Sequence, residues 1–133
     1  MTLSLRQEIY WAIEAAQDKQ AVDVTVLNLS AVGAFAEYFL LCSGHSTPQI
    51  RAIAEAIEER LARHGIRLAH REGKGEAEWV LLDYGYFVVH IFSERAREYY
   101  DLERLWRTAE RVNFPPPMRP PESSRDSNTD TVP

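Results

Sequence analysis

The sequence predicts a single compact α/β domain in which helices flank a sheet. Its length of 133 residues fits one domain with a proper hydrophobic core. Two stretches, residues 4–18 and the segment that follows Pro48, repeat their apolar residues at helical spacing. Five other stretches have the apolar or alternating pattern of β-strands, at residues 22–29, 38–44, 66–71, 79–83 and 86–92.

The first predicted helix covers residues 4–18. Ser4 and Gln7 match a capping box at its N-terminus. Its apolar stripe, which we expect to face the core, consists of Leu5, Ile9, Ala12, Ile13 and Ala16.

Two strands follow, at residues 22–29 and 38–44, joined by a short connection. Both contain continuous apolar runs, which are typical of strands that are buried on both faces. We therefore expect them to lie centrally in the sheet. Cys42, the single cysteine, lies in the second strand, which excludes a disulfide framework and favours a reducing compartment.

The segment Gly44–Pro48 connects the second strand to the next helix. Thr47 suits the N-cap, Pro48 suits the first helical position, and Gly65 suits the position just after the helix. A Gly/Ser/Thr loop at a helix N-terminus can also bind an anion. The loop lacks a Walker lysine and the G-x-G-x-x-G spacing, so capping is favoured and nucleotide binding stays as the alternative.

Residues 66–71 alternate and predict a strand nearer the sheet edge, followed by a polar loop at 71–78. The next two strands form a hairpin with Tyr84-Gly85 between them. Gly85 suits the positive φ that a two-residue loop requires. In this register Asp83 pairs with Tyr86, and Trp79 lies directly opposite His90.

The alternation gives the hairpin two different faces. One face is entirely apolar and belongs in a core: Val80, Leu82, Phe87, Val89 and Ile91. The other face mixes aromatic side chains with an acid and an imidazole: Trp79, Leu81, Asp83, Tyr86, Val88, His90 and Phe92. Two interpretations remain for this second face. A helix covers it and His90 is a core residue, or it is a surface that binds a partner.

After the hairpin, Ser93 is a good N-cap for a helix that runs through Glu98, and Asp101 suits the start of a second helical segment up to Val112. Five residues are expected to face inward: Tyr99, Leu102, Leu105, Trp106 and Ala109. We assign residues 1–114 to the folded domain. Residues 115–133 are rich in Pro and Ser and predict a disordered tail.

Charge and motifs exclude several classes of protein. With 15 basic and 20 acidic residues the net charge is −5, so sequence-specific binding to nucleic acid is disfavoured and a basic protein partner is favoured. No metal-ligand or catalytic motif is present, Asp83 and His90 lie too far apart in the predicted register for an acid–base pair, and we expect no enzyme, metal or cofactor. No signal peptide or membrane-length apolar run is found, which predicts a cytoplasmic protein without membrane association.

These residues are similar to those of the ribosomal silencing factor family, also called RsfS or Iojap. The similarity spans about residues 4–107. The most specific stretch is E-W-V-L-L-D-Y-G at 78–85. Further matches lie at residues 23–29, 38–44, 49–54, 88–92 and 96–106.

The resemblance implies a mixed five-stranded sheet, similar to nucleotidyltransferases but without their catalytic carboxylates. It also implies binding to ribosomal protein fourteen of the large subunit, which blocks joining of the small subunit and represses translation during starvation. Carried onto this chain, the family's hairpin motif places that contact at Trp79, Asp83 and Tyr84, with Leu82, Gly85 and His90 as near neighbours. A homodimer through the same aromatic face is a third possibility.

Overall fold

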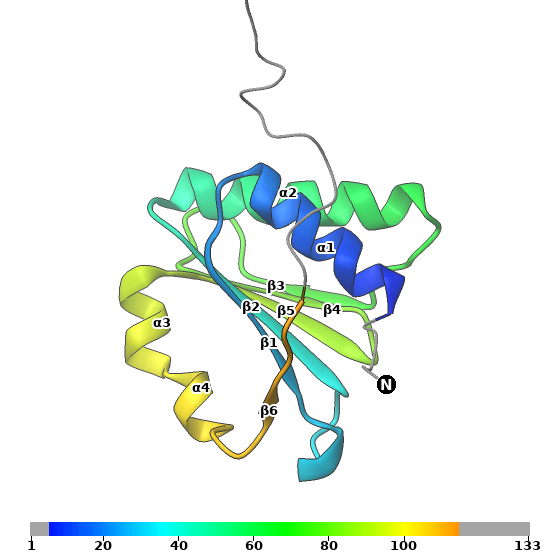
Figure 1. Cartoon of the computed structure of the whole chain (residues 1–133). Helices are drawn as coiled ribbons and strands as arrows, with labels where there is room; N and C mark the ends of the chain where they lie inside the picture. Colours follow the sequence, from blue (N-terminus) through cyan, green and yellow to red (C-terminus); the bar gives the residue numbers. More distant parts are fainter. Residues whose placement is uncertain (1–5, 115–133) are drawn as a thin grey trace, which may run out of the picture.

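The computed structural model describes residues 6–114, and the predicted tail at 115–133 lies outside this range. The elements in chain order are α1 (Gln7–Asp18), β1 (Val22–Asn28), the 3₁₀ helix η1 (Ser30–Val32), β2 (Tyr38–Gly44), α2 (Thr47–Arg63), β3 (His70–Glu72), β4 (Trp79–Asp83), β5 (Phe87–Ser93), α3 (Glu94–Tyr100), α4 (Leu102–Leu105) and β6 (Glu110–Arg111). They form one α/β domain with helices on both faces of a sheet (Figure 1), which confirms the predicted fold class.

The sheet is mixed and has six strands in the order β3-β4-β5-β2-β1-β6, one more than predicted. Within residues 6–114, β2 and β5 are the only parallel neighbours, and the other pairs are antiparallel. The additional strand, β6, pairs Arg111 with Leu27 and Glu110 with Asn28. Two residues are too short to produce a period-2 pattern, so only the tertiary pairing reveals this strand.

Helices α1 and α2 lie side by side over one face of the sheet (Figure 1). The main core lies between them and the sheet, because the apolar stripes of both helices meet the apolar face of the hairpin. All five residues of that predicted face are buried: Val80, Leu82, Phe87, Val89 and Ile91. Five residues of α2 are also buried: Ile50, Ile53, Ala54, Ile57 and Leu61.

Helices α3 and α4 lie against the opposite face and cover part of it (Figure 1). Leu102, Trp106 and Ala109 pack inward, as predicted. The prediction is wrong for Tyr99 and Leu105, which are 80% and 70% exposed. Asp101 separates the two helices in the left-handed conformation, with φ 48°, and this changes the helical phase. The predicted segment up to Val112 is also wrong, since α4 ends at Leu105 and the chain turns into β6.

Several predicted boundaries shift. The N-cap residue of α1 is Arg6, and the predicted cap Ser4 lies outside the described residues. For α2 the N-cap is Ser46 rather than Thr47, because the Ser46 hydroxyl accepts a hydrogen bond from Gln49 N. Strand β3 begins at His70 instead of Ile66, although its edge position is as predicted.

The hairpin register differs from the prediction by two residues. Asp83 pairs with Val88, and Trp79 pairs with Phe92 rather than His90. Tyr84 N donates to Phe87 O at 3.0 Å, so the two-residue loop is Gly85-Tyr86, with Gly85 at φ 96°. A shift of two residues preserves the side-chain parity, so the residues of β4 and β5 stay on their predicted faces. The prediction is wrong for Tyr86, which the shift places in the loop: its ring packs against the main core and its hydroxyl donates to Glu8 on α1 at 3.0 Å.

Candidate functional site

The candidate site is the part of the second face that α3 and α4 leave open. Here we define the second face by the side chains of three adjacent strands that point away from α1 and α2. They are Trp79, Leu81 and Asp83 on β4, Val88, His90 and Phe92 on β5, and Phe39 and Leu41 on β2. Phe92 and Leu41 are buried beneath α3 and α4, whereas Trp79, Leu81, Asp83, Val88 and Phe39 remain partly exposed.

Trp79 lies at the border between the covered and open parts of this face. Its ring centroid is 5.0 Å from that of Phe92 and 4.5 Å from that of Tyr100 on α3. The indole Nε1 donates a hydrogen bond to His90 Nδ1 at 3.1 Å. These contacts fix the indole and leave it half-buried, a state typical of an aromatic anchor at an interface.

His90 is 3% exposed and is one of two polar residues among the buried ones described. Because an indole nitrogen only donates, Nδ1 must be the acceptor, and the neutral imidazole carries its proton on Nε2. Burial lowers the pKa of His90 from 6.5 to about 4. Nε2 has no hydrogen-bond partner among the described residues, so a buried donor remains unsatisfied.

Asp83 lies at the end of β4, beside the hairpin turn. One oxygen of its carboxylate, Oδ1, accepts a hydrogen bond from Gly85 N at 2.8 Å. Gly85 supplies the positive φ that the first loop position needs. The turn therefore holds the carboxylate at the rim of the second face.

Two predicted site residues lie elsewhere. Leu82 points into the main core and is fully buried, as its strand parity requires. Tyr84 was expected to expose its ring because it was placed in the turn, and that expectation is wrong. Tyr84 is 9% exposed and its ring stacks on that of Phe87 with the centroids 5.1 Å apart, since the turn begins one residue later, at Gly85. The structure thus brings Trp79 and His90 into contact and places Asp83 on the same face, at the end of β4 beside the turn that Gly85 begins.

A cavity of about 450 Å³ opens on the second face next to these residues. It is lined by strand side chains, by Trp106 and by the loop that precedes β2. The lining residues are Gly33, Ala34, Phe35, Ala36, Phe39, Leu81, Asp83, Val88, His90 and Trp106. Phe35 stands at the rim with its side chain fully exposed. The sequence analysis did not predict Phe35 as a site residue. The one indication in the sequence was that a large apolar side chain lies in a short connecting loop.

The Gly44–Pro48 loop already uses its polar groups within the chain. His45 N donates to Gln49 Oε1 at 2.6 Å, and Gln49 Nε2 donates to the carbonyls of Lys19 and Gln20. Ser46 caps the helix through Gln49 N. The side chain of Gln49 thus occupies the position where an anion would meet these amides, which weighs against the nucleotide-binding alternative.

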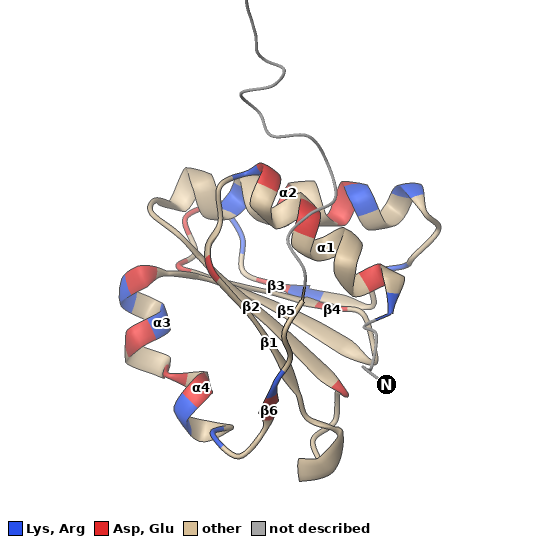
Figure 2. Cartoon of the chain, viewed as in Figure 1, with Lys and Arg blue, Asp and Glu red and all other residues tan. Residues whose placement is uncertain are grey.

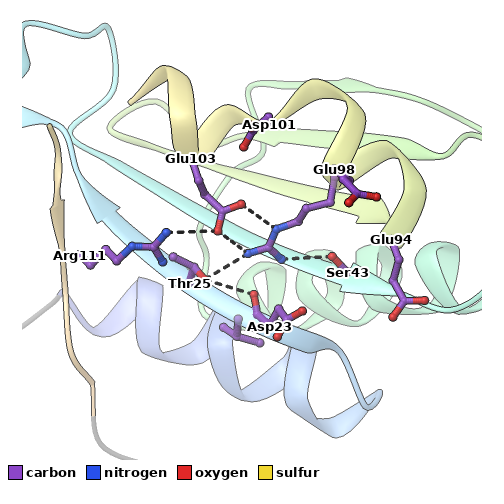
Figure 3. Close-up of a pocket in the computed structure, with 10 residues that line it drawn as sticks. Asp23, Thr25, Ser43, Glu94, Glu98, Asp101, Glu103 and Arg111 are labelled. Carbon is purple, nitrogen blue, oxygen red and sulfur yellow. Dashed lines mark hydrogen bonds and ion pairs between the residues drawn. The ribbon is translucent and has the colours of Figure 1, made fainter. Parts of the chain in front are cut away.

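A second cavity, of about 590 Å³, lies beside α3 at the edge of β1 (Figure 3). Its central cation, Arg97, donates to Ser43 Oγ, Thr25 Oγ1 and both oxygens of Glu103. The hydrogen bonds from Arg97 lower the pKa of Glu103. Through these four hydrogen bonds Arg97 joins α3 and α4 to the sheet, and the carboxylate of Glu103 already occupies its charge, which weighs against an anionic ligand here.

Among residues 6–114, no group of three or more His, Cys, Asp or Glu side chains is arranged to hold a metal ion. Charged side chains of both signs are scattered over the helices, and the strands carry few of them (Figure 2). Within the same described range, no helix is long and apolar enough to cross a membrane.

Comparison with known proteins identifies the family. Residues 2–132 match the profile of the family described as "Ribosomal silencing factor during starvation". The chain belongs to the RsfS family. It is 43% identical over 98 residues to the ribosomal silencing factor RsfS of Bacillus subtilis, an alignment that covers 74% of this chain and 83% of the relative.

Two solved structures are similar to this chain in sequence and in fold. A crystal structure of a Bacillus halodurans protein has 37% identity and a TM-score of 0.72, with 82% of this chain and 100% of that chain covered. A Chromobacterium violaceum crystal structure has 29% identity and a TM-score of 0.75, with 89% and 95% covered. The α/β fold is thus shared with proteins of known structure.

Proposed function

We propose that this protein represses translation by binding the large ribosomal subunit through ribosomal protein fourteen of that subunit. The bound protein blocks joining of the small subunit sterically, in the cytoplasm and under starvation. The observation that carries the proposal is the partly open aromatic face around Trp79 and Asp83, in a chain of the silencing factor family.

The proposed action requires binding and no chemistry. Cys42 is fully buried and burial raises its pKa to about 12, so it is a poor nucleophile. Asp83 and His90 share a face, yet Nδ1 of His90 is bonded to Trp79 and its low pKa favours the neutral imidazole. To block joining sterically, the protein needs only enough affinity for the large subunit to compete with the small subunit. Aromatic anchor residues at an interface supply such affinity.

The contact residues have separate roles in this proposal. Trp79 contributes apolar contact area, Asp83 attracts a lysine or arginine of the partner, and Gly85 lets the turn approach closely. His90 holds Trp79 and borders the cavity. Leu82 and Tyr84 support this surface from the core side and touch the partner little, because both are buried.

Sedimentation with isolated large subunits tests the proposal directly. The wild-type protein should co-sediment and should reduce joining of added small subunits, whereas W79A and D83K should do neither. E55A on the exposed surface of α2 is the control and should behave as wild type. Melting temperatures of all four proteins separate lost binding from lost folding. If the folded wild type stays in the supernatant, the proposal is wrong.

A further inference from the structure

The cavity beside Trp79 combines three features that point to a specific occupant. Its walls are mainly apolar and come from Phe39, Leu81, Val88 and Trp106. Among the described residues that line it, Asp83 is the one acid and none is Lys or Arg. Its imidazole, His90, is buried and held in place by the bond from Trp79. Apolar walls with a few polar groups are the usual composition of a binding pocket.

We propose that this cavity is a socket for one apolar side chain from a protein segment that also carries a lysine or arginine. The inference rests on the proposed function and assigns the segment to the ribosomal partner. The apolar side chain fills the socket, and the neighbouring cation pairs with Asp83 at its rim. Phe35, fully exposed at the rim, covers the inserted side chain.

The charge and lining of the socket favour protein over RNA. A phosphate backbone would meet the Asp83 carboxylate, with no lysine or arginine in the lining to attract it. The bond from Gly85 N goes to Oδ1 of Asp83. The other carboxylate oxygen, Oδ2, is therefore available to accept a hydrogen bond from a cationic side chain. The socket is therefore suited to a basic protein segment.

His90 fixes the shape of the socket and does not bond the incoming segment. The bond from Trp79 holds Nδ1 as an acceptor, so the opposite nitrogen, Nε2, carries the hydrogen. Nε2 is buried and has no hydrogen-bond partner in residues 6–114, so an oxygen of a docking segment does not reach it. The contacts offered to the segment are therefore the apolar lining and the carboxylate of Asp83.

The first test fills the socket. V88F places a larger side chain in the lining, and binding to purified ribosomal protein fourteen is measured by calorimetry beside sedimentation with intact large subunits. We expect affinity to fall on the order of 30-fold or more, as for loss of one anchoring side chain. The melting temperature should stay level or rise, because a filled cavity packs better. Y99A, exposed on α3 outside the socket, is the matched control and should bind as wild type.

The second test removes the charge at the rim. D83N keeps an acceptor for Gly85 N but has no negative charge to pair with a lysine or arginine. D83N should therefore bind about tenfold more weakly than wild type. Equal affinities of D83N and wild type, with both proteins folded, would overturn the pairing with a cation.

The outcomes distinguish this inference from the function on which it rests. If folded wild type and V88F bind equally well, the function stands and the socket is wrong. If wild type binds large subunits but not isolated protein fourteen, RNA or another protein is the partner and the socket assignment is overturned. If wild type binds neither, the proposed function and the socket fail together.

Discussion

The indole of Trp79 and the imidazole of His90 are joined by a hydrogen bond of 3.1 Å across neighbouring strands. The two residues are diagonal neighbours, because Trp79 pairs with Phe92 and His90 pairs with Leu81. This single bond determines the tautomer of His90 and restrains the half-exposed indole. The covered and open parts of the second face are therefore coupled through it.

His90 predicts an acid-sensitive stability. Its pKa is about 4 in the fold against 6.5 in the unfolded chain, because burial disfavours the charged form. Between these values the unfolded chain binds more protons, so the free energy of unfolding decreases as the pH falls from 6.5 to 4, by on the order of 3 kcal/mol. Urea unfolding across this range should show a shallower pH slope for H90N than for wild type. Parallel slopes would mean that His90 titrates normally.

Arg97 should be important for stability. Its side chain is 12% exposed and connects Glu103 to Ser43 and Thr25. R97M leaves the half-buried Glu103 with only the longer contact to Arg111, and it should lower the free energy of unfolding by about 2–4 kcal/mol. R95M is the control, because the Arg95–Glu78 pair is largely exposed and its loss should not be measurable. Equal unfolding midpoints for the two variants would contradict this role.

Tyr84 tests whether the hairpin contact includes the core side of the turn. Its hydroxyl is buried without a hydrogen-bond partner among the described residues, so Y84F should leave stability unchanged or raise it by up to about 1 kcal/mol. Ribosome binding should not change, which sedimentation would show. A loss of binding with an intact fold would restore Tyr84 as a direct contact.

Leu82 provides the opposite case. It is fully buried between β4 and the helices, and L82A should cost about 2–5 kcal/mol of unfolding free energy through the cavity it leaves. At a temperature where the variant is folded, its affinity for large subunits should match wild type. Weakened binding by fully folded L82A would show that the core shape under the hairpin affects the contact.

Gly85 should be sensitive to substitution for conformational reasons alone. A Cβ at this position would have no neighbour within 4 Å, yet φ is 96°, which strains any L-residue. G85A should therefore lower the free energy of unfolding by about 1–2 kcal/mol, as measured by urea denaturation. No change in the midpoint would indicate that the turn relaxes to another type.

Much of the site could be predicted because side-chain parity is local. The alternation around the hairpin separates the core face from the second face, and for the residues of β4 and β5 this separation survives a two-residue error in register, whereas Tyr86 moves into the loop and packs on the core side. Tyr84 and Tyr99 could not be placed correctly, because their exposure depends on where the turn begins and on the left-handed Asp101. Neither conformation has a strong local pattern.

The sequence by itself determined the α/β class, the helices α1 and α2, the strands of the hairpin and the family of the protein, because amphipathic periodicity and local motifs are properties of neighbouring residues. The tertiary structure alone decided the sixth strand, the Trp79–His90 bond, the Arg97 network and the cavity under Phe35. The sixth strand, the Arg97 network and the cavity join residues far apart in the chain, and the Trp79–His90 bond depends on the hairpin register, so all of them depend on packing that no local pattern encodes.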